Sequence, residues 1–163
     1  MKKKISLFKE PSPIPFTKQG FKETEVLYEK LLSERPAAVA DLKKARDMGD
    51  LSENGYYKSA RWKLSDVDRQ LRHLRYLLKY GKITLDTIDG SVGINTTVTV
   101  SDGEGELTYQ IVGDYEANPR ERKISTRSPL GAALLGKNIG NTAIFSTQQG
   151  EKKLKIISIV QSK

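Results

Sequence analysis

The sequence contains no cysteine, a single histidine and no long apolar run. The lack of cysteine excludes disulfides and thiol chemistry, and one histidine is too few for a zinc finger. Any metal ion must therefore be held by oxygen ligands, which suit Mg²⁺ or Mn²⁺. No segment approaches the ~18 consecutive apolar residues that a membrane span needs, so we expect no membrane partner.

The first residues are basic but lack the apolar stretch of a signal peptide. Three lysines precede the four-residue apolar run ISLF, which Lys9 and Glu10 then interrupt. Prolines at positions 11, 13 and 15 favour extended chain. We expect residues 1–16 to form a flexible basic tail, and a cytoplasmic location for the protein.

Positive charge is unevenly distributed along a chain whose formal net charge is +8. Residues 58–82 contain eight Lys and Arg residues against two Asp residues, so this segment alone carries +6. Such a basic field favours a polyanion, usually nucleic acid, although a solvated helix face has the same composition.

The first helical pattern follows the tail. Thr17 can cap a helix that begins near Lys18 and ends at about Met48, with Gly49 as its C-terminal stop. A proline removes a backbone donor and disfavours the helical conformation of the residue before it. We therefore expect a kink or a break near Arg35–Pro36.

The second helical pattern is more regular. Its apolar residues alternate three and four apart, which is typical of a coiled-coil seam over three heptads. Because the link between the two helices is short, they must fold back antiparallel, and residues 17–81 are predicted to form a coiled-coil hairpin. The seam residues are Tyr57, Ala60, Leu64, Val67, Leu71, Leu74 and Leu78.

The link is GDLSEN, residues 49–54, and it has two interpretations. Asp50 and Glu53 fit a capping box at the start of the second helix, and Ser52 could also cap it. Alternatively, the two carboxylates at the hairpin tip enter a partner's cavity and bind a divalent cation, for which the partner supplies the remaining ligands. Spacing alone favours capping.

After Gly81 the pattern changes to that of strands, which are rich in Val, Ile, Thr and Tyr. One short helix is expected among them, with Ser128 as N-cap, Pro129 as its first residue and Gly136 as its stop. The fold class is therefore α+β: the hairpin, a linker at 82–92 and a small antiparallel β domain with one helix at 93–163. The strands are expected at 97–100, 107–112, 123–126, 142–146 and 154–160.

The tip and its surroundings form the motif AxxxGDLSENxxYxxA, residues 45–60. This motif resembles the Gre transcript-cleavage factors of bacterial RNA polymerase, the GreA/GreB transcription elongation factors. The segments IPFTKQGFKETEVLYEKL, ERP, TYQIVGDYEA, ISTRSPLGAALLGKNIG and KLKIISIV resemble further parts of the family in the right order. The resemblance covers nearly the whole chain and implies an FKBP-like fold for the C-terminal domain.

The resemblance also implies a function. The C-terminal domain would dock on RNA polymerase while the coiled coil enters the secondary channel and reaches the nascent RNA 3′ end of a backtracked complex. By the family pattern, Asp50 and Glu53 help to hold a second catalytic Mg²⁺, shared with the polymerase, and Ser52 supports the tip. The protein would stimulate the polymerase's own RNA cleavage by a two-metal mechanism without being an enzyme itself, and we expect it to be a monomer.

Two sets of residues are further candidates for contacts with these partners. Basic residues within about four turns of the tip could reach the extruded RNA or the channel wall through contacts that weaken with salt; they are Lys43, Arg46, Lys58 and Arg61. The family's polymerase-docking region corresponds to Arg127, Ser128 and Pro129. Arg127 departs from the Asn or Asp that is typical there, and Tyr56 replaces an acid beside the tip and could stack on a base.

Three other functions remain open at this point. A Gre-like protein could occupy the channel and inhibit the polymerase, although such proteins carry a more acidic tip. A basic coiled coil could bind RNA or DNA, or a protein partner, without polymerase, its two acids serving only as caps. A peptidyl-prolyl isomerase would need an aromatic-lined pocket, which Tyr109, Tyr115 and Phe145 alone do not make evident.

Overall fold

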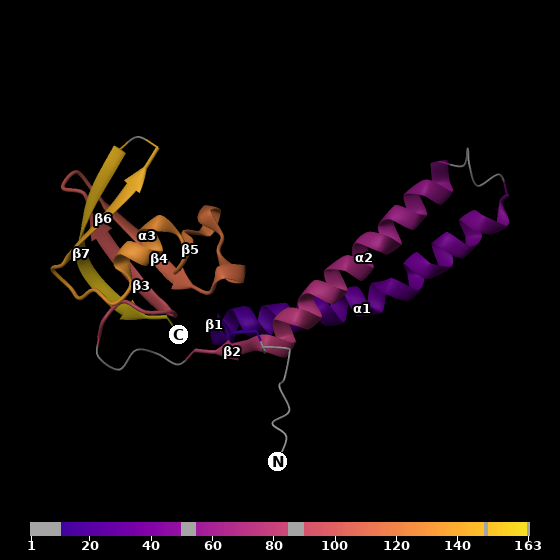
Figure 1. Ribbon diagram of the computed structural model, residues 1–163, viewed down its shortest axis with the longest axis horizontal. Coiled ribbons are helices and arrows are strands. Elements are labelled where there is room, and N and C mark those ends of the chain that lie inside the picture. The colour runs from indigo at the N-terminus through magenta and orange to yellow at the C-terminus, as the bar shows by residue number, and fades with distance from the viewer. Residues whose placement is uncertain (1–10, 50–54, 85–89, 149, 163) are drawn as a thin grey trace, which may run out of the picture. The chain divides into compact units, whose positions relative to one another are not determined.

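The computed structural model describes residues 11–49, 55–84, 90–148 and 150–162. The chain divides into two units: a helical unit at residues 21–81, and a sheet unit that combines residues 1–20 with residues 82–163. The predicted α+β architecture, a helical hairpin followed by a β domain with one α-helix, is confirmed. Figure 1 shows the elements of both units.

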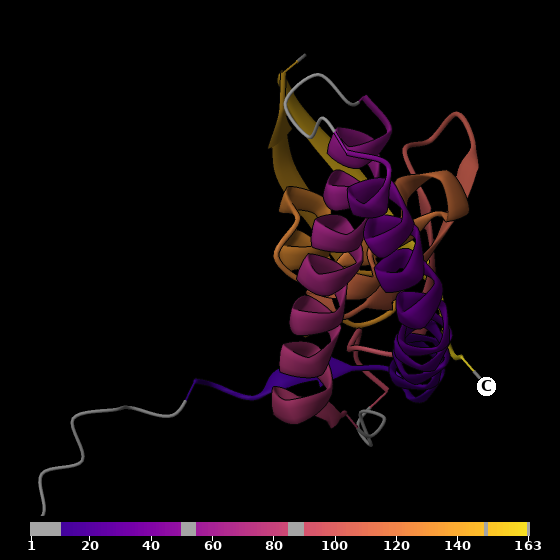
Figure 2. The same cartoon turned by 90° about the vertical axis from the view of Figure 1, so that its right-hand side faces the viewer.

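The helical unit contains α1 (Lys18–Asp47) and α2 (Gly55–Tyr80), which lie side by side in Figures 1 and 2. Among the described residues, three polar side-chain pairs join them: Tyr28 with Arg75, Arg35 with Asp68, and Asp41 with Lys63. The residue number of the α2 partner decreases as that of the α1 partner increases. The two helices are therefore antiparallel, as predicted. None of the described helices is both long and apolar enough for a membrane span.

The seam between the helices contains the apolar residues that the heptad pattern predicts. Leu31 packs with Val67, Leu71 and Leu74, and Tyr28 lies against this cluster. Of the seven predicted seam residues, four are buried and three are half-buried, and in the last turn of α2 Leu77 is buried instead of Leu78. The half-buried ones are Tyr57, Leu64 and Leu78. An α-helix has 3.6 residues per turn, so a seam repeating every 3.5 residues drifts around the helix toward its end.

The first helix continues through Pro36, so a break at Arg35–Pro36, one of the two predicted alternatives, is wrong, and the kink stays a prediction. The proline removes one backbone hydrogen bond, but the seam continues in register on both sides of it, with Leu31 and Ala38 buried. Both predicted ends of the helix are confirmed. Thr17 Oγ1 accepts a hydrogen bond from the Gly20 N–H at 2.9 Å, and Gly49 has a φ of +74° just beyond the last turn.

The sheet unit is built on five strands in the order β5-β4-β3-β7-β6. All neighbouring pairs are antiparallel except β4 and β5, which are parallel. The parallel pair is possible because the chain returns through two 3₁₀ helices, η1 (Asp114–Glu116) and η2 (Pro119–Glu121). The strands are β3 (Thr96–Ser101), β4 (Glu106–Val112), β5 (Lys123–Ser125), β6 (Thr142–Thr147) and β7 (Gly150–Gln161).

One face of this sheet packs against α3 (Pro129–Leu134) and forms the core of the unit. The predicted cap is confirmed: Ser128 Oγ accepts a hydrogen bond from the Gly131 N–H at 3.0 Å. Gly136 follows the helix with a φ of +72°. Alternate residues of the strands point into the core, which consists of Val92, Val98, Val100, Ile111, Leu134, Ala143, Leu154 and Ile156.

A second, two-stranded sheet forms from the segment before α1 and the segment after α2. It pairs β1 (Ile14–Phe16) with β2 (Gly81–Ile83). The prediction that residues 14–16 belong to a flexible tail is wrong, because they form a strand in which Phe16 is only 1% exposed. Ser91 and Val92, assigned to the linker, are also buried.

Candidate functional site

The hairpin tip is the first candidate site. α1 ends at Asp47, the Gly49 N–H donates to the Arg46 carbonyl at 3.1 Å, and α2 begins at Gly55. The predicted site residues Asp50, Ser52 and Glu53 lie outside the described residues, so their roles stay predictions. Carboxylate oxygens are the ligands that Mg²⁺ prefers, so the donor set fits that ion. Among the described residues, no group of three or more His, Asp or Glu side chains could hold a metal ion.

The four predicted nucleic-acid residues flank this tip. Lys43 and Arg46 lie in the last turns of α1, and Lys58 and Arg61 lie in the first turns of α2. All four are exposed, and none forms an ion pair with a residue that the structure describes. The antiparallel register places Lys43 level with Arg61 and Arg46 level with Lys58, so their positive charges gather at two levels next to the tip.

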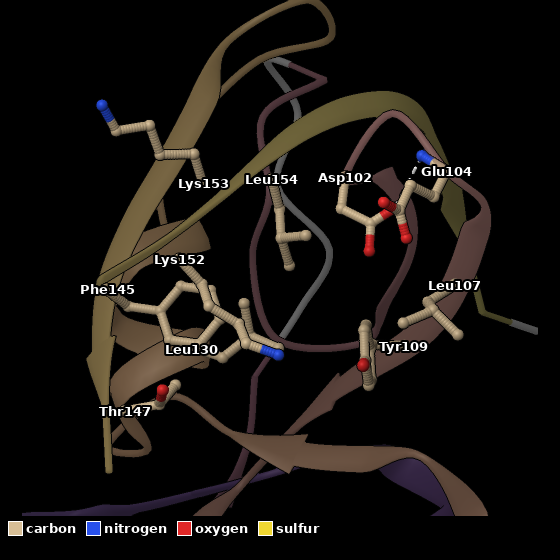
Figure 3. A pocket seen from close by; sticks show the side chains of 10 residues that line it. All are labelled: Asp102, Glu104, Leu107, Tyr109, Leu130, Phe145, Thr147, Lys152, Lys153 and Leu154. Atoms are coloured by element: carbon tan, nitrogen blue, oxygen red, sulfur yellow. Dashed lines mark hydrogen bonds between the residues drawn. The ribbon is translucent and has the colours of Figure 1, made fainter. Parts of the chain in front are cut away.

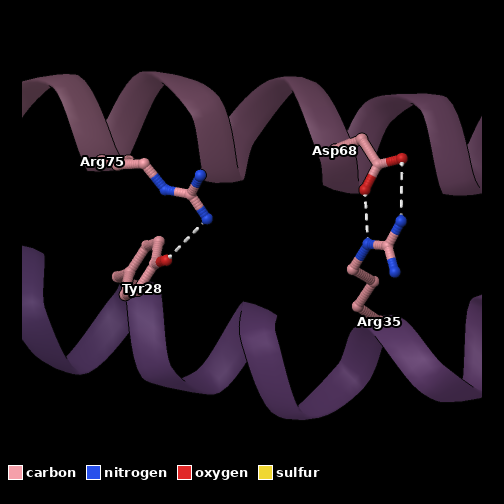
Figure 4. A network of polar contacts seen from close by, with 4 residues as sticks. All are labelled: Tyr28, Arg35, Asp68 and Arg75. Carbon is pink, nitrogen blue, oxygen red and sulfur yellow. Dashed lines mark hydrogen bonds and ion pairs between the residues drawn. The ribbon is translucent and has the colours of Figure 1, made fainter.

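Farther from the tip, polar contacts tie the two helices together (Figure 4). The Arg35 guanidinium donates to both Asp68 carboxylate oxygens, at 2.7 and 3.5 Å. This hydrogen bond is the main reason why the pKa of Asp68 lies below its usual value. Arg75 donates to the Tyr28 hydroxyl at 3.2 Å two turns away. These contacts fix the register of the hairpin and hence which residues of the two helices flank the tip.

Two of the predicted docking residues, Arg127 and Ser128, lie in the loop that joins β5 to α3, and Pro129 is the first residue of α3. Arg127 has an 85% exposed side chain, and its Nε lies 3.3 Å from Asp114 Oδ2. The same carboxylate accepts a hydrogen bond from Ser125 Oγ at 2.8 Å, and Ser125 Oγ accepts one from the Arg127 N–H. Sequence reasoning missed Asp114 and Ser125, because they act through contacts made only in the folded loop.

Ser128 and Pro129 line a shallow hollow of about 610 Å³ beside this loop, together with Ile124, Leu130 and Phe145. The structure therefore brings Ser128 and Pro129 together with apolar side chains on one exposed surface. The arrangement suits a protein partner that presents apolar side chains.

A neighbouring hollow of about 470 Å³ contains the two aromatic residues Tyr109 and Phe145 (Figure 3). Charged side chains also line it, among them Asp102, Glu104 and Lys152. Asp102 accepts hydrogen bonds from the Glu104 and Gly105 N–H groups, which lower its pKa. Tyr115, the third aromatic residue considered for an isomerase pocket, does not line this hollow.

The start of α1 is anchored within the sheet unit. The Glu116 carboxylate accepts a hydrogen bond from the Thr17 N–H at 2.7 Å, ninety-nine residues away in sequence. A Cβ on Gly20 would lie 2.2 Å from the Glu116 carboxyl carbon, and one on Gly113 would lie 2.2 Å from the Pro15 carbonyl oxygen. Both glycines therefore permit a close approach that the sequence pattern did not reveal.

Comparison with known proteins agrees with the assignment of the motifs. Residues 14–83 match the family model for the transcription elongation factor N-terminal domain, and residues 87–161 match the model for the GreA/GreB C-terminal domain. The chain therefore belongs to the GreA/GreB family of transcription elongation factors.

Two curated relatives illustrate how far the similarity extends. Transcription elongation factor GreA of Paracoccus denitrificans is 39% identical over 150 residues, which cover 90% of this chain and 96% of the relative. GreA of Macrococcus caseolyticus is 40% identical over 152 residues, with 89% and 95% covered. Among solved structures, the GreA factor homolog 1 protein of Thermus thermophilus is 24% identical, with a TM-score of 0.43 and coverage of 91% of this chain and 99% of that one.

Proposed function

We propose that this protein binds RNA polymerase and stimulates the polymerase's own cleavage of backtracked nascent RNA. The observation that carries the proposal is the acidic tip motif on an antiparallel coiled coil, in a chain that matches both GreA/GreB domain models. The protein would assist the polymerase active site without being an enzyme itself.

The hairpin would act as the arm that enters the secondary channel. The 30 residues of α1 give it a length of roughly 45 Å at ~1.5 Å per residue. The two helices form a slender rod, and the apolar seam and the Arg35–Asp68 ion pair oppose their separation. Such a rod can carry a short loop into a space too narrow for the sheet unit.

At the end of this arm, Asp50 and Glu53 would supply negative charge to the polymerase active site. A divalent cation bound between them and the polymerase would stabilise the charge that develops during phosphodiester hydrolysis. Two carboxylates alone bind Mg²⁺ weakly, so most of the other ligands must come from the polymerase and water. Ser52 would help to shape the tip, and Lys43, Arg46, Lys58 and Arg61 would contact RNA phosphates or the channel wall.

The sheet unit would dock on the polymerase through the surface around Arg127, Ser128 and Pro129. Support comes from the apolar hollow beside Ser128 and Pro129 and from the exposed guanidinium held by Asp114. Because Asp114 partly neutralises Arg127, this contact would depend on shape and apolar area more than on charge.

The proposal is tested by measuring RNA 3′-end cleavage in stalled, backtracked polymerase complexes with Mg²⁺. Wild-type protein should accelerate cleavage, whereas Asp50→Ala and Glu53→Ala should each lose most of the stimulation. Both variants should still compete with wild-type protein for the polymerase. Glu104→Ala, which removes an exposed acid from a turn of the sheet unit, is the matched control and should stimulate fully.

Normal stimulation by both tip variants would refute the proposed role of the acids and leave them as helix caps. Slower transcription without cleavage would indicate a channel-occupying inhibitor. Binding of free RNA or DNA that is unaffected by Asp50→Asn and needs no polymerase would indicate a nucleic-acid-binding coiled coil.

A further inference from the structure

Trp62 in the second turn of α2 has no structural role that the fold explains. It is the only tryptophan of the chain, and its side chain is 70% exposed. It makes no hydrogen bond or ring contact with any residue in the described part of the chain. Tryptophan is usually highly buried, so the fold loses hydrophobic stabilisation by exposing it. A single exposed apolar residue is common, however, and only the groups around the ring can indicate a binding role.

Two cations lie near the ring, both before it in α2 and therefore closer to the tip. Lys58 is four residues before Trp62, so these two side chains are neighbours on the helix surface. Arg61 directly precedes Trp62 and is turned about 100° from it around the helix, but it is the neighbour of Lys58, three residues away. The three side chains form a continuous strip, here called the Trp62 patch. Neither cation pairs with a described acid. By contrast, Lys63 lies 3.7 Å from Asp41, and Arg69 pairs with Asp66.

The other neighbours of the ring are polar. Ser59 and Ser65, three residues before and after Trp62, are both exposed and lie on the same face. Asp66, four residues after Trp62, also borders this face, but its carboxylate pairs with Arg69. Short side chains leave the flat faces of the indole accessible, and they provide no apolar surface for a protein partner to cover. An accessible aromatic ring next to unpaired cations is typical of surfaces that bind single-stranded nucleic acid, where bases stack on the ring and the cations contact phosphates.

We infer that Trp62 stacks on an unpaired base of the extruded RNA while Lys58 and Arg61 contact the adjoining phosphates. This inference rests on the proposed function, because RNA must leave the polymerase active site beside the hairpin tip. Trp62 lies seven residues from the start of α2 at Gly55, which is about 10 Å along the helix axis. The stack therefore holds the extruded RNA strand against the second turn of α2. As a result, the protein binds backtracked complexes more tightly than complexes without extruded RNA.

The test compares binding to two RNA polymerase complexes assembled on the same scaffold. One complex is backtracked by several nucleotides, and in the other the RNA 3′ end occupies the active site. Affinities are measured without divalent cation, so that no RNA is cleaved. Trp62→Ala should weaken binding to the backtracked complex about tenfold, because one base–aromatic stack is worth roughly 5- to 150-fold in affinity. Its binding to the other complex should be unchanged.

Two further substitutions separate stacking from simple apolar contact. Trp62→Tyr keeps a flat aromatic ring and should retain most of the preference, whereas Trp62→Leu keeps apolar surface and should behave as Trp62→Ala. Tyr76→Ala, which removes a 41% exposed aromatic ring two heptads farther from the tip, is the matched control and should bind as wild type. Melting curves should coincide for all Trp62 variants, since the ring contributes no packing.

Each other outcome contradicts the inference in a recognisable way. Equal binding by wild type and Trp62→Ala, or wild-type affinity in Trp62→Leu, would overturn the stacking role while leaving the cleavage function intact. Equal weakening on both complexes would assign Trp62 to the channel wall. A wild-type protein that neither binds polymerase nor stimulates cleavage would overturn the proposed function together with this inference.

Discussion

The two units of this protein bury apolar residues in different ways. The core of the sheet unit includes Val98, Val100, Ile111 and Leu134, which are all 0% exposed. In the seam of the helical unit, the cluster of four large apolar residues remains 7–8% exposed, and only small residues such as Ala45 reach 0%. A pair of helices has a single interface, so its large apolar side chains lie near solvent, whereas a sheet covered by a helix encloses its core.

This difference suggests a division of roles. The sheet unit has a close-packed core and shallow hollows on its surface, where we propose that a partner binds. The hairpin is a thin arm whose two helices are held together by many individually weak contacts. The proposed functional residues of the hairpin lie on its surface and at its tip, outside the seam. Substitutions in the cores should therefore change stability, and substitutions at the tip should change activity without changing stability.

The largest effect on stability is expected for Ile111→Ala in the sheet unit. Removing a fully buried isoleucine leaves a cavity that a close-packed core cannot refill, at a cost of about 4 kcal/mol. Hydrogen exchange followed by mass spectrometry should show lost protection in β3, β4 and β7, with protection of the helices retained. Ile111→Val is the control and should cost only about 1 kcal/mol. Equal loss of protection in both units would contradict their separation.

A smaller loss is expected for Leu71→Ala in the seam. The same kind of truncation should cost about 2–3 kcal/mol, because a site bordered by solvent can partly collapse or hydrate. The helical signal in circular dichroism should melt at lower temperature, while the neighbouring exposed substitution Arg72→Ala should leave the transition nearly unchanged. A cost equal to that of Ile111→Ala would show that the hairpin is packed as tightly as the sheet unit.

A still smaller effect is expected for Gly113→Ala, which tests how the start of the chain is attached. The added Cβ would lie 2.2 Å from the Pro15 carbonyl oxygen, so β1 must shift, at a cost of about 1–3 kcal/mol. Backbone NMR should show faster exchange at Phe16 and Thr17. Gly105→Ala, where nothing lies within 4 Å of the added Cβ, is the control. Unchanged exchange at Phe16 would contradict the docking of β1.

The smallest effect is expected for the pH dependence of the hairpin. The pKa of Asp68 is lowered by the Arg35 hydrogen bond, so its contribution to stability is present above the usual carboxyl pKa of 3.8 and is lost as pH falls through the lowered value. Asp68→Asn should therefore slightly lower the melting temperature at pH 7 and reduce the difference between pH 7 and pH 2. Glu25→Gln, an exposed acid on α1, is the matched control. An unchanged difference in Asp68→Asn would show that the pair is formed without stabilising the hairpin.

Features fixed by local sequence signals were predictable. The heptad spacing from Tyr57 to Leu74 specified the seam, and the ends of α1 and α3 followed from Thr17, Gly49 and Ser128, because caps act within a few residues. The tip motif likewise identified the family that both domain models confirm.

Features that depend on distant partners were not predictable. The strand Ile14–Phe16 is short, follows Pro13 and contains Pro15, and its partner strand lies more than sixty residues away at Gly81–Ile83. The hydrogen bond between Thr17 and Glu116 joins residues ninety-nine positions apart, so it forms only once the start of α1 and η1 have come together in the fold. The continuity of α1 through Pro36 reflects tertiary packing of the seam, which outweighs the helix propensity of one residue.

The most direct test of the central claim is the Mg²⁺ dependence of RNA cleavage by backtracked polymerase. If Asp50 and Glu53 act by helping to hold a cation, Asp50→Asn and Glu53→Gln should raise the half-saturating Mg²⁺ concentration several-fold, and high Mg²⁺ should restore part of the rate. An unchanged half-saturating concentration with either variant would contradict the claim that the tip delivers cation ligands.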